Sequence, residues 1–204
     1  MGTRNPVVAG AFYPFGTSEL KTSVERFLSA AKAKPRACIG IVSPHAGYSY
    51  CGAVAAEAYK AASGSKPDTV IVIGPNHTGS GAGVATSRGA WNTPLGSIRV
   101  DDALAERLGK EGIVDDQLAH AREHSIEVQL PWIQTAFAGA AFVPVCINPL
   151  YFEKQNCRTI GKALAAAARE LGRKVLLVAS SDFTHYGTMY GNTPFTGATS
   201  QVLK

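Results

Sequence analysis

Three histidines stand in short polar stretches that directly follow apolar, strand-like runs: His45, His77 and His185. The carboxyl ends of parallel strands meet at one edge of an open sheet, which is where ligands bind. We therefore expect these imidazoles to line one crevice although they are far apart in the sequence. Imidazole suits iron, zinc and copper, and two histidines with one anionic ligand leave positions open for a substrate or dioxygen.

Asp182 stands three residues before His185, a separation at which a short turn directs both side chains into the same cavity. A carboxylate beside an imidazole raises the pKa of the imidazole and fixes its tautomer, as a general base or a metal ligand requires. Asp182 and His185 are therefore candidates for acid-base chemistry.

The two remaining histidines are less informative. His124 follows Glu123 and either caps a helix or contacts a substrate, and the sequence leaves both alternatives open. His120 stands alone in a polar, helix-like stretch, and we expect it at the surface without a role.

These side chains need a scaffold of strands and helices. Four apolar runs that we predict as buried strands alternate with helix-like segments, which indicates an α/β fold: one domain with a mainly parallel or mixed sheet flanked by helices. Thr17 or Ser18 is the expected N-cap of the first helix. The predicted strands are 38–42, 69–73, 141–147 and 174–179, the predicted helices are 17–33, 52–62, 101–112, 125–137 and 153–171, and residues 83–100 resemble a hairpin.

The composition is that of one globular core. Of the 204 residues, 46% are hydrophobic and 17% are charged, which argues against disorder. The longest apolar runs are about five residues, far below the roughly 18 that a membrane-spanning helix needs. The opening residues lack the apolar segment of a secretory signal. We therefore expect a cytoplasmic protein that does not bind a membrane.

Charge and cysteine content argue against a nucleic-acid-binding protein and against a disulfide-rich or zinc-ribbon protein. The formal net charge is +5, but the basic residues are scattered singly along predicted helices, so we expect no nucleic-acid partner. The four cysteines show no CxxC spacing and mostly lie in apolar runs. This pattern is typical of reduced, buried thiols and indicates neither a disulfide framework nor a zinc ribbon. The face of the helix over 153–171 that we expect to be buried includes Cys157.

Five segments of the sequence resemble the motifs of the Memo family, in the order of that family. They are Asn5-Pro6-x-x-Ala9-Gly10-x-Phe12-Tyr13-Pro14, Pro44-His45-Ala46-Gly47-Tyr48-x-Tyr50-x-Gly52, Gly74-Pro75-Asn76-His77, Glu123-His124-Ser125-x-Glu127-x-x-Leu130-Pro131 and Ser180-Ser181-Asp182-Phe183-Thr184-His185-Tyr186-Gly187.

The resemblance implies a fold related to the class III extradiol dioxygenases, the LigB-like non-haem iron enzymes. It implies that His45 and His77 are metal ligands and that His185 takes the place of the acid-base histidine of the dioxygenases. Asp182 and His124 would line the same pocket. The implied cofactor is a divalent metal, in the first place Fe(II), with copper or zinc as alternatives.

The resemblance also implies a third ligand, a cysteine, in a segment that would follow Lys204. None of the four cysteines of this chain matches that motif. We therefore expect residues 1–204 to be a single Memo-like domain that is incomplete at its C-terminal end.

Three functions are compatible with these residues. The first is an iron-dependent oxygenase or another redox enzyme that acts on a small molecule. The second is a non-enzymatic binding or signalling protein that uses the dioxygenase-like cavity for a peptide or small ligand. The third, a metal-dependent hydrolase, ranks last because the carboxylate-rich two-metal pattern is missing. Whether the protein is an enzyme at all, its substrate and its oligomeric state stay open.

Overall fold

A computed structural model describes residues 2–194. Its centre is a mixed sheet of six strands in the order β2-β9-β3-β8-β4-β7. All neighbouring pairs are parallel except β8 with β4, so the predicted mainly parallel sheet is confirmed. The strands are β2 (Gly40–Ser43), β3 (Thr69–Pro75), β4 (Val84–Thr86), β7 (Val114–Asp115), β8 (Ala141–Ile147) and β9 (Val175–Ser180).

A second, smaller sheet joins the N-terminal residues to the body of the domain. Its strands are β1 (Thr3–Arg4), β5 (Ala90–Thr93) and β6 (Gly96–Arg99). Strands β5 and β6 form the hairpin that the sequence predicts within residues 83–100. Strand β1 is too short to be recognised from sequence, and it pairs in parallel with β5. This pairing holds the start of the chain close to the central sheet.

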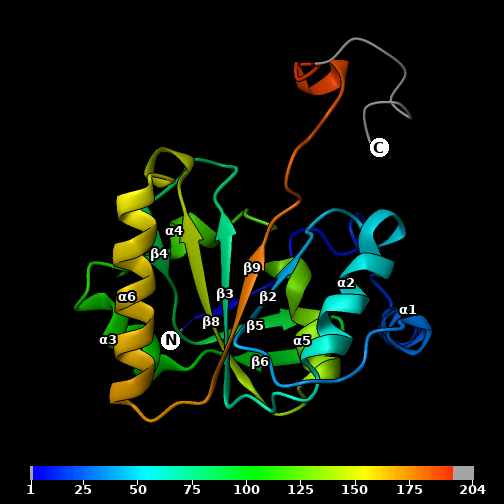
Figure 1. The fold of residues 1–204 in the computed structure, drawn as a ribbon, viewed down its shortest axis with the longest axis horizontal. Coiled ribbons are helices and arrows are strands. Elements are labelled where there is room, and N and C mark those ends of the chain that lie inside the picture. Colours follow the sequence, from blue (N-terminus) through cyan, green and yellow to red (C-terminus); the bar gives the residue numbers. More distant parts are fainter. Residues whose placement is uncertain (1, 195–204) are drawn as a thin grey trace.

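The main helices form two groups that lie on opposite sides of the strands in Figure 1. One group packs together beside β2, and the other packs together near β8 and β4. The first group is α1 (Thr17–Ala30), α2 (Tyr48–Ala62) and α5 (Leu130–Ala136), and the second is α3 (Asp102–Gly109) and α6 (Lys154–Glu170). The single turns are α4 (Gln117–His120), η1 (Glu127–Gln129), η2 (Pro149–Tyr151) and η3 (Thr188–Tyr190).

The ends of these helices follow the local sequence in most places. The side chain of Asp101 accepts a hydrogen bond from the Leu104 N–H at 3.2 Å, which caps α3. Pro131 lies in the first turn of α5, where its missing N–H costs nothing. Helix α1 differs from the prediction, because Gly16 precedes it and the Thr17 hydroxyl donates to the Pro94 carbonyl instead.

An aromatic cluster holds the first helix group together. The ring centroid of Trp132 on α5 lies 4.8 Å from that of Tyr48 and 5.9 Å from that of Tyr59, both on α2. All three side chains are buried, and such ring pairs contribute about 0.5–1.5 kcal/mol beyond their area. The Tyr48 N–H also donates to the Phe12 carbonyl at 2.7 Å. These contacts fix the start of α2, which directly follows the loop with His45.

Burial along the sheet corrects the prediction for the first strand. The central strands β3 and β8 are buried on both faces, as expected of a parallel sheet. Strand β2 is instead an edge strand, and Val42 is exposed, as is Ile39 just before it with an exposed fraction of 85%. An apolar run of this kind predicts a strand but does not report its position within the sheet.

The cysteines are also less buried than predicted. Cys146 on β8 is buried, Cys38 and Cys51 are half-buried, and Cys157 on α6 is exposed. Cys157 lies in the first turn of α6, one turn before Ile160, where the buried face of the helix begins. No disulfide joins the four cysteines, which are all free thiols. Within the described residues, no helix is long and apolar enough to cross a bilayer.

Candidate metal centre

The carboxyl ends of three neighbouring strands build the site. Strands β2, β9 and β3 are parallel and adjacent, so the loops that follow them meet at one edge of the sheet (Figure 1). His45 comes two residues after β2, His77 two residues after β3, and Asp182 two residues after β9. The expectation that strand-end residues converge is therefore confirmed.

Three imidazoles form a cluster at this edge. One ring nitrogen from each of His45, His77 and His124 lies within 4.8 Å of the others, an arrangement that could hold a metal ion. The ring centroids are 5.2 Å apart for His45 and His77 and 4.8 Å apart for His77 and His124. His124 reaches the cluster from the segment between α4 and η1. The family resemblance implied that His124 lines the pocket, but not that it joins His45 and His77 as a potential ligand.

A carboxylate that the sequence analysis did not select supports two of these rings. Glu123 is buried, and its Oε1 lies 3.0 Å from Nδ1 of His77 and 3.5 Å from Nδ1 of His124. It also accepts the backbone N–H groups of His77, His124 and Ser125. The sequence offered one sign of this role: Glu123 directly precedes His124, in a motif that also contains Glu127.

Ser180, the last residue of β9, supports the remaining ring, that of His45. Nδ1 of His45 lies 3.0 Å from the Ser180 hydroxyl oxygen. Because the Nδ1 atoms of His45 and His77 are both engaged by the protein, the Nε2 atoms are the nitrogens left for a ligand. Ser180 was also missed, because nothing local marks a serine as the partner of a histidine 135 residues away.

Asp182 links two loops of the site. Its Oδ1 accepts the N–H groups of His45 at 2.6 Å and of Ala46 at 3.2 Å. Its Oδ2 lies 3.8 Å from Nε2 of His45 and 3.7 Å from Nε2 of His185. Phe183, the next residue, has a φ of +57°, a left-handed conformation that bulky residues rarely adopt. The turn that directs Asp182 and His185 toward one another is therefore strained.

His185 lies at the margin of the cluster. Its side chain is about half exposed, on the segment that continues beyond the sheet edge toward η3 (Figure 1). Its ring centroid lies 5.0 Å from that of Tyr190. Together with His45 and His77 it lines one hollow, so the three strand-end histidines do share a crevice. Their roles stay predictions.

The environment sets different protonation preferences for the rings. Burial lowers the pKa of His45 to about 4, although Asp182 opposes the shift, and burial also lowers the pKa of His124. The hydrogen bond to Glu123 raises the pKa of His77. Burial would raise the pKa of Glu123, but hydrogen bonds from His77 and Ser125 outweigh it and lower that pKa to about 2. The neutral forms favoured for His45 and His124, beside the Glu123 carboxylate, suit a divalent cation.

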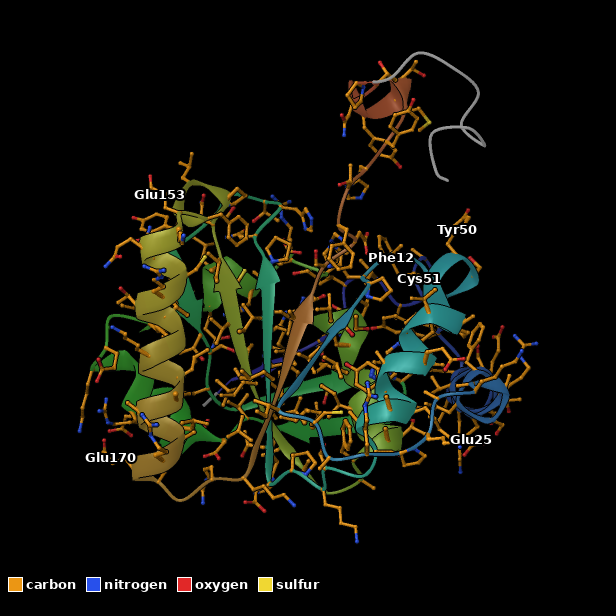
Figure 2. All side chains as sticks on the ribbon, viewed as in Figure 1. Phe12, Glu25, Tyr50, Cys51, Glu153 and Glu170 are labelled. Atoms are coloured by element: carbon orange, nitrogen blue, oxygen red, sulfur yellow. The ribbon has the colours of Figure 1, made fainter. Side chains whose placement is uncertain are left out.

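Two hollows open onto the cluster and share His45, His77, Asp182 and His185. One has a volume of about 360 Å³ and the other about 680 Å³. Phe12 and Tyr50, which Figure 2 labels at this end of the molecule, line the larger hollow. The smaller one has mainly apolar walls, formed by Ile73, Pro75, Phe152, Ala179 and Phe183.

The N-terminal segment supplies one wall of the site. Glu127 is fully buried and receives hydrogen bonds from Arg4 Nη1 and from the Tyr13 hydroxyl, both at 2.7 Å. It also accepts two backbone N–H groups of the intervening segment. The segment is thereby held against η1, and the ring of Phe12 lies 4.7 Å from that of His124.

Two further groups lie outside the cluster. Cys51 donates its thiol proton to the Ala46 carbonyl, and burial raises its pKa to about 11, so the thiol stays protonated at neutral pH in the metal-free protein. The cysteine ligand expected after Lys204 lies outside the described residues. His120 is fully buried, so the expectation of a surface position was wrong. It packs edge-on against Trp91, a contact that no local pattern reveals.

The chain is similar to known proteins over most of its length. A family model described as Memo-like protein matches residues 4–201. A MEMO1 family protein of Methanococcus maripaludis is 46% identical in an alignment 201 residues long. The alignment covers 90% of this chain and 70% of that protein. One from Methanopyrus kandleri is 45% identical and covers 90% and 69%. One from Thermococcus kodakarensis is 45% identical and covers 94% and 68%. The family match spans every residue of the histidine cluster.

Proposed function

The chain belongs to the Memo-like protein family, and from this membership and the geometry of the cluster we propose that it is a metal-dependent protein whose His45, His77 and His124 hold one divalent ion. The observation that carries the proposal is the convergence of one nitrogen from each of the three rings within 4.8 Å. The resemblance alone implied His45 and His77, and the tertiary structure adds His124.

The residues present fit such an ion in both geometry and chemistry. Nitrogens that bind one zinc-sized ion in tetrahedral geometry lie about 3.4 Å apart, so the rings, whose nitrogens lie within 4.8 Å of one another, would have to move inward to bind it. His45 and His124 have lowered pKa values and so favour the neutral form that binds metal. Glu123 and Asp182 place carboxylates next to the rings, which offsets the charge of a cation.

We propose Fe(II) as the physiological ion, with copper or zinc as alternatives, because imidazole suits all three. Bound iron would supply redox chemistry at a centre that three protein nitrogens leave partly open. The small substrate would occupy the 360 Å³ hollow, whose walls are mainly apolar.

His185 and Asp182 form the proposed acid-base pair. His185 is exposed enough to exchange protons with solvent, and it lines both hollows. Asp182 Oδ2 lies between the Nε2 atoms of His45 and His185 and so can stabilise a positive charge on His185. In this proposal His185 moves a proton to or from the substrate, and Asp182 holds His185 in position.

A second candidate function is a binding protein that uses the same cavity for a peptide or small ligand without catalysis. It is favoured by the aromatic side chains that the rim presents to solvent, since Tyr50 and Phe183 have exposed fractions of 88% and 79%. Exposed aromatic residues of this kind are enriched where partners bind. A cytoplasmic location and the absence of nucleic-acid and membrane partners remain predictions.

Metal analysis tests the proposal. The protein is purified without chelators, loaded anaerobically with Fe(II) or aerobically with zinc, and its metal content is measured. We expect one ion per chain in the wild type, little in His77→Ala and His124→Ala, and an unchanged amount in the matched control His185→Ala. No bound metal at any supply, or equal binding in a variant that lacks all three cluster histidines, would overturn it. Ligand binding that survives loss of the metal would favour the second candidate.

A further inference from the structure

A buried polar network lies against the nitrogens of the histidine cluster that do not face a ligand. It consists of Glu123, Ser125, Gln129 and Ser180, all of them buried. Each hydrogen bond in this network has only one possible direction, so the network also determines which nitrogen of each ring carries the proton.

Ser180 determines the tautomer of His45. Its hydroxyl oxygen lies 2.6 Å from the Ser125 carbonyl, which can only accept, so the single hydroxyl proton points there. The same oxygen must then accept from its other neighbours, Nε2 of Gln129 at 3.0 Å and Nδ1 of His45 at 3.0 Å. Nδ1 of His45 therefore carries the hydrogen, and the lone pair is on Nε2.

Gln129 secures this arrangement. Its Nε2 also donates to the Pro44 carbonyl at 2.9 Å, and its Oε1 accepts from the Tyr59 hydroxyl at 3.0 Å. A flipped amide would bring its oxygen against the Pro44 carbonyl and lose that bond. The amide nitrogen of Gln129 therefore always donates to the Ser180 hydroxyl oxygen. The hydroxyl proton of Ser180 stays in the hydrogen bond to the Ser125 carbonyl.

Glu123 determines the tautomer of His77 in the same way. A carboxylate only accepts, so the 3.0 Å contact requires the hydrogen on Nδ1 of His77 and leaves the lone pair on Nε2. The two branches meet at Ser125, whose N–H donates to Glu123 and whose carbonyl accepts from Ser180.

We propose that Ser180, Gln129 and Glu123 are positioning residues that fix the Nδ1–H tautomers of His45 and His77, so that both Nε2 lone pairs point to one place before an ion arrives. The metal-binding consequence rests on the proposed function, whereas the tautomers are a property of the metal-free protein. Outer-shell partners of this kind typically change metal affinity 10–100-fold.

The test begins with the metal-free protein. Nitrogen-15 NMR of the histidine rings distinguishes the two tautomers directly. We expect the Nδ1–H form for both His45 and His77 in the wild type. Ser180→Ala should change the signals of His45 and leave those of His77, Glu123→Gln should change those of His77 and leave those of His45, and Ser180→Thr, which keeps the hydroxyl, should restore His45. Wild-type rings in the Nε2–H form, or tautomers that neither Ser180→Ala nor Glu123→Gln alters, would overturn the proposal.

Cobalt(II) titration then measures the consequence for metal binding. We expect Ser180→Ala and Glu123→Gln each to weaken cobalt binding 10–100-fold and to change the visible absorption bands. The matched control is Glu57→Gln, since Glu57 also accepts two backbone N–H groups, those of Lys32 and Ala33, but lies on α2 outside the cluster. Equal affinity and spectra in all variants would refute the positioning role.

The two proposals fail in distinguishable ways. If the wild type binds no cobalt but shows both Nδ1–H tautomers, the metal function is overturned and the tautomer assignment is supported. If the wild type binds cobalt while both rings interconvert freely, the metal function is supported and the positioning role is overturned.

Discussion

Oε1 of Glu123 lies 3.0 Å from Nδ1 of His77, and this contact joins a carboxylate that is 1% exposed to an imidazole that is 43% exposed. The solvent-facing side of the imidazole can therefore contact a ligand, while the contact with Glu123 fixes the ring on its buried side. Because Glu123 directly precedes His124, the same residue couples the loop after β3 to the segment that brings the third histidine.

The buried ion pair at the N-terminal segment should dominate the stability of that region. Arg4→Ala removes the 2.7 Å partner of Glu127 and leaves its carboxylate buried. Breaking a buried pair in this way costs about 3–5 kcal/mol, which urea unfolding followed by circular dichroism would measure. The control Arg88→Ala breaks the exposed pair with Asp115 and should change little. Similar effects of the two substitutions would contradict the prediction.

Acid should destabilise the fold through His120. Burial, and then the charge of Arg4, lower the pKa of His120 from 6.5 to about 4. The unfolded chain therefore binds this proton more readily, so stability is lost as the pH falls from about 6.5 toward 4. The loss reaches about 3 kcal/mol at 1.36 kcal/mol per pKa unit.

Urea unfolding between pH 7 and pH 4 checks this effect. His120→Leu should reduce the slope of stability against pH, because it removes the buried ring that the unfolded chain protonates more readily. Other buried groups such as His45 contribute the remaining slope. An unchanged slope in His120→Leu would show that the buried ring already takes up its proton in the folded state.

Gly74 should be required because β3 packs closely against the segment that carries His124 at this position. A Cβ at this position would lie 2.6 Å from the Ser125 hydroxyl oxygen and 3.0 Å from a side-chain carbon of Ile126. Gly74→Ala should therefore displace this segment and weaken metal binding, as cobalt titration would show. The control Gly161→Ala, in the exposed face of α6 with open space around it, should keep metal binding and add about 0.5–1 kcal/mol of stability. Unaltered affinity in Gly74→Ala would argue against a tight constraint.

Asp182 should act through two separate features of its carboxyl group. Asp182→Asn keeps an oxygen that can accept the N–H groups of His45 and Ala46, so the loop and metal binding should be preserved while acid-base chemistry with His185 is lost. Asp182→Ala removes the acceptor as well and should weaken metal binding about 10–100-fold. Metal content and cobalt affinity of the two variants, compared side by side, separate these roles, and equal losses in both would contradict the separation.

The sequence alone determined the α/β class, the approximate span of most strands and helices and the convergence of strand-end residues. Apolar periodicity is a local property, and in a parallel sheet it also predicts which loops share an edge. His45, His77 and His185 were found in this way because each stands in a polar stretch that follows a strand.

Only the tertiary structure decided which groups complete the site. His124, Glu123 and Ser180 act through contacts with residues far away in the chain, such as the 135 residues that separate His45 from Ser180. The edge position of β2 and the burial of His120 likewise depend on which elements pack around them. A histidine in a polar stretch looks the same whether it caps a turn, lies in the core or faces an ion, because burial and hydrogen-bond partners arise only when distant segments come together.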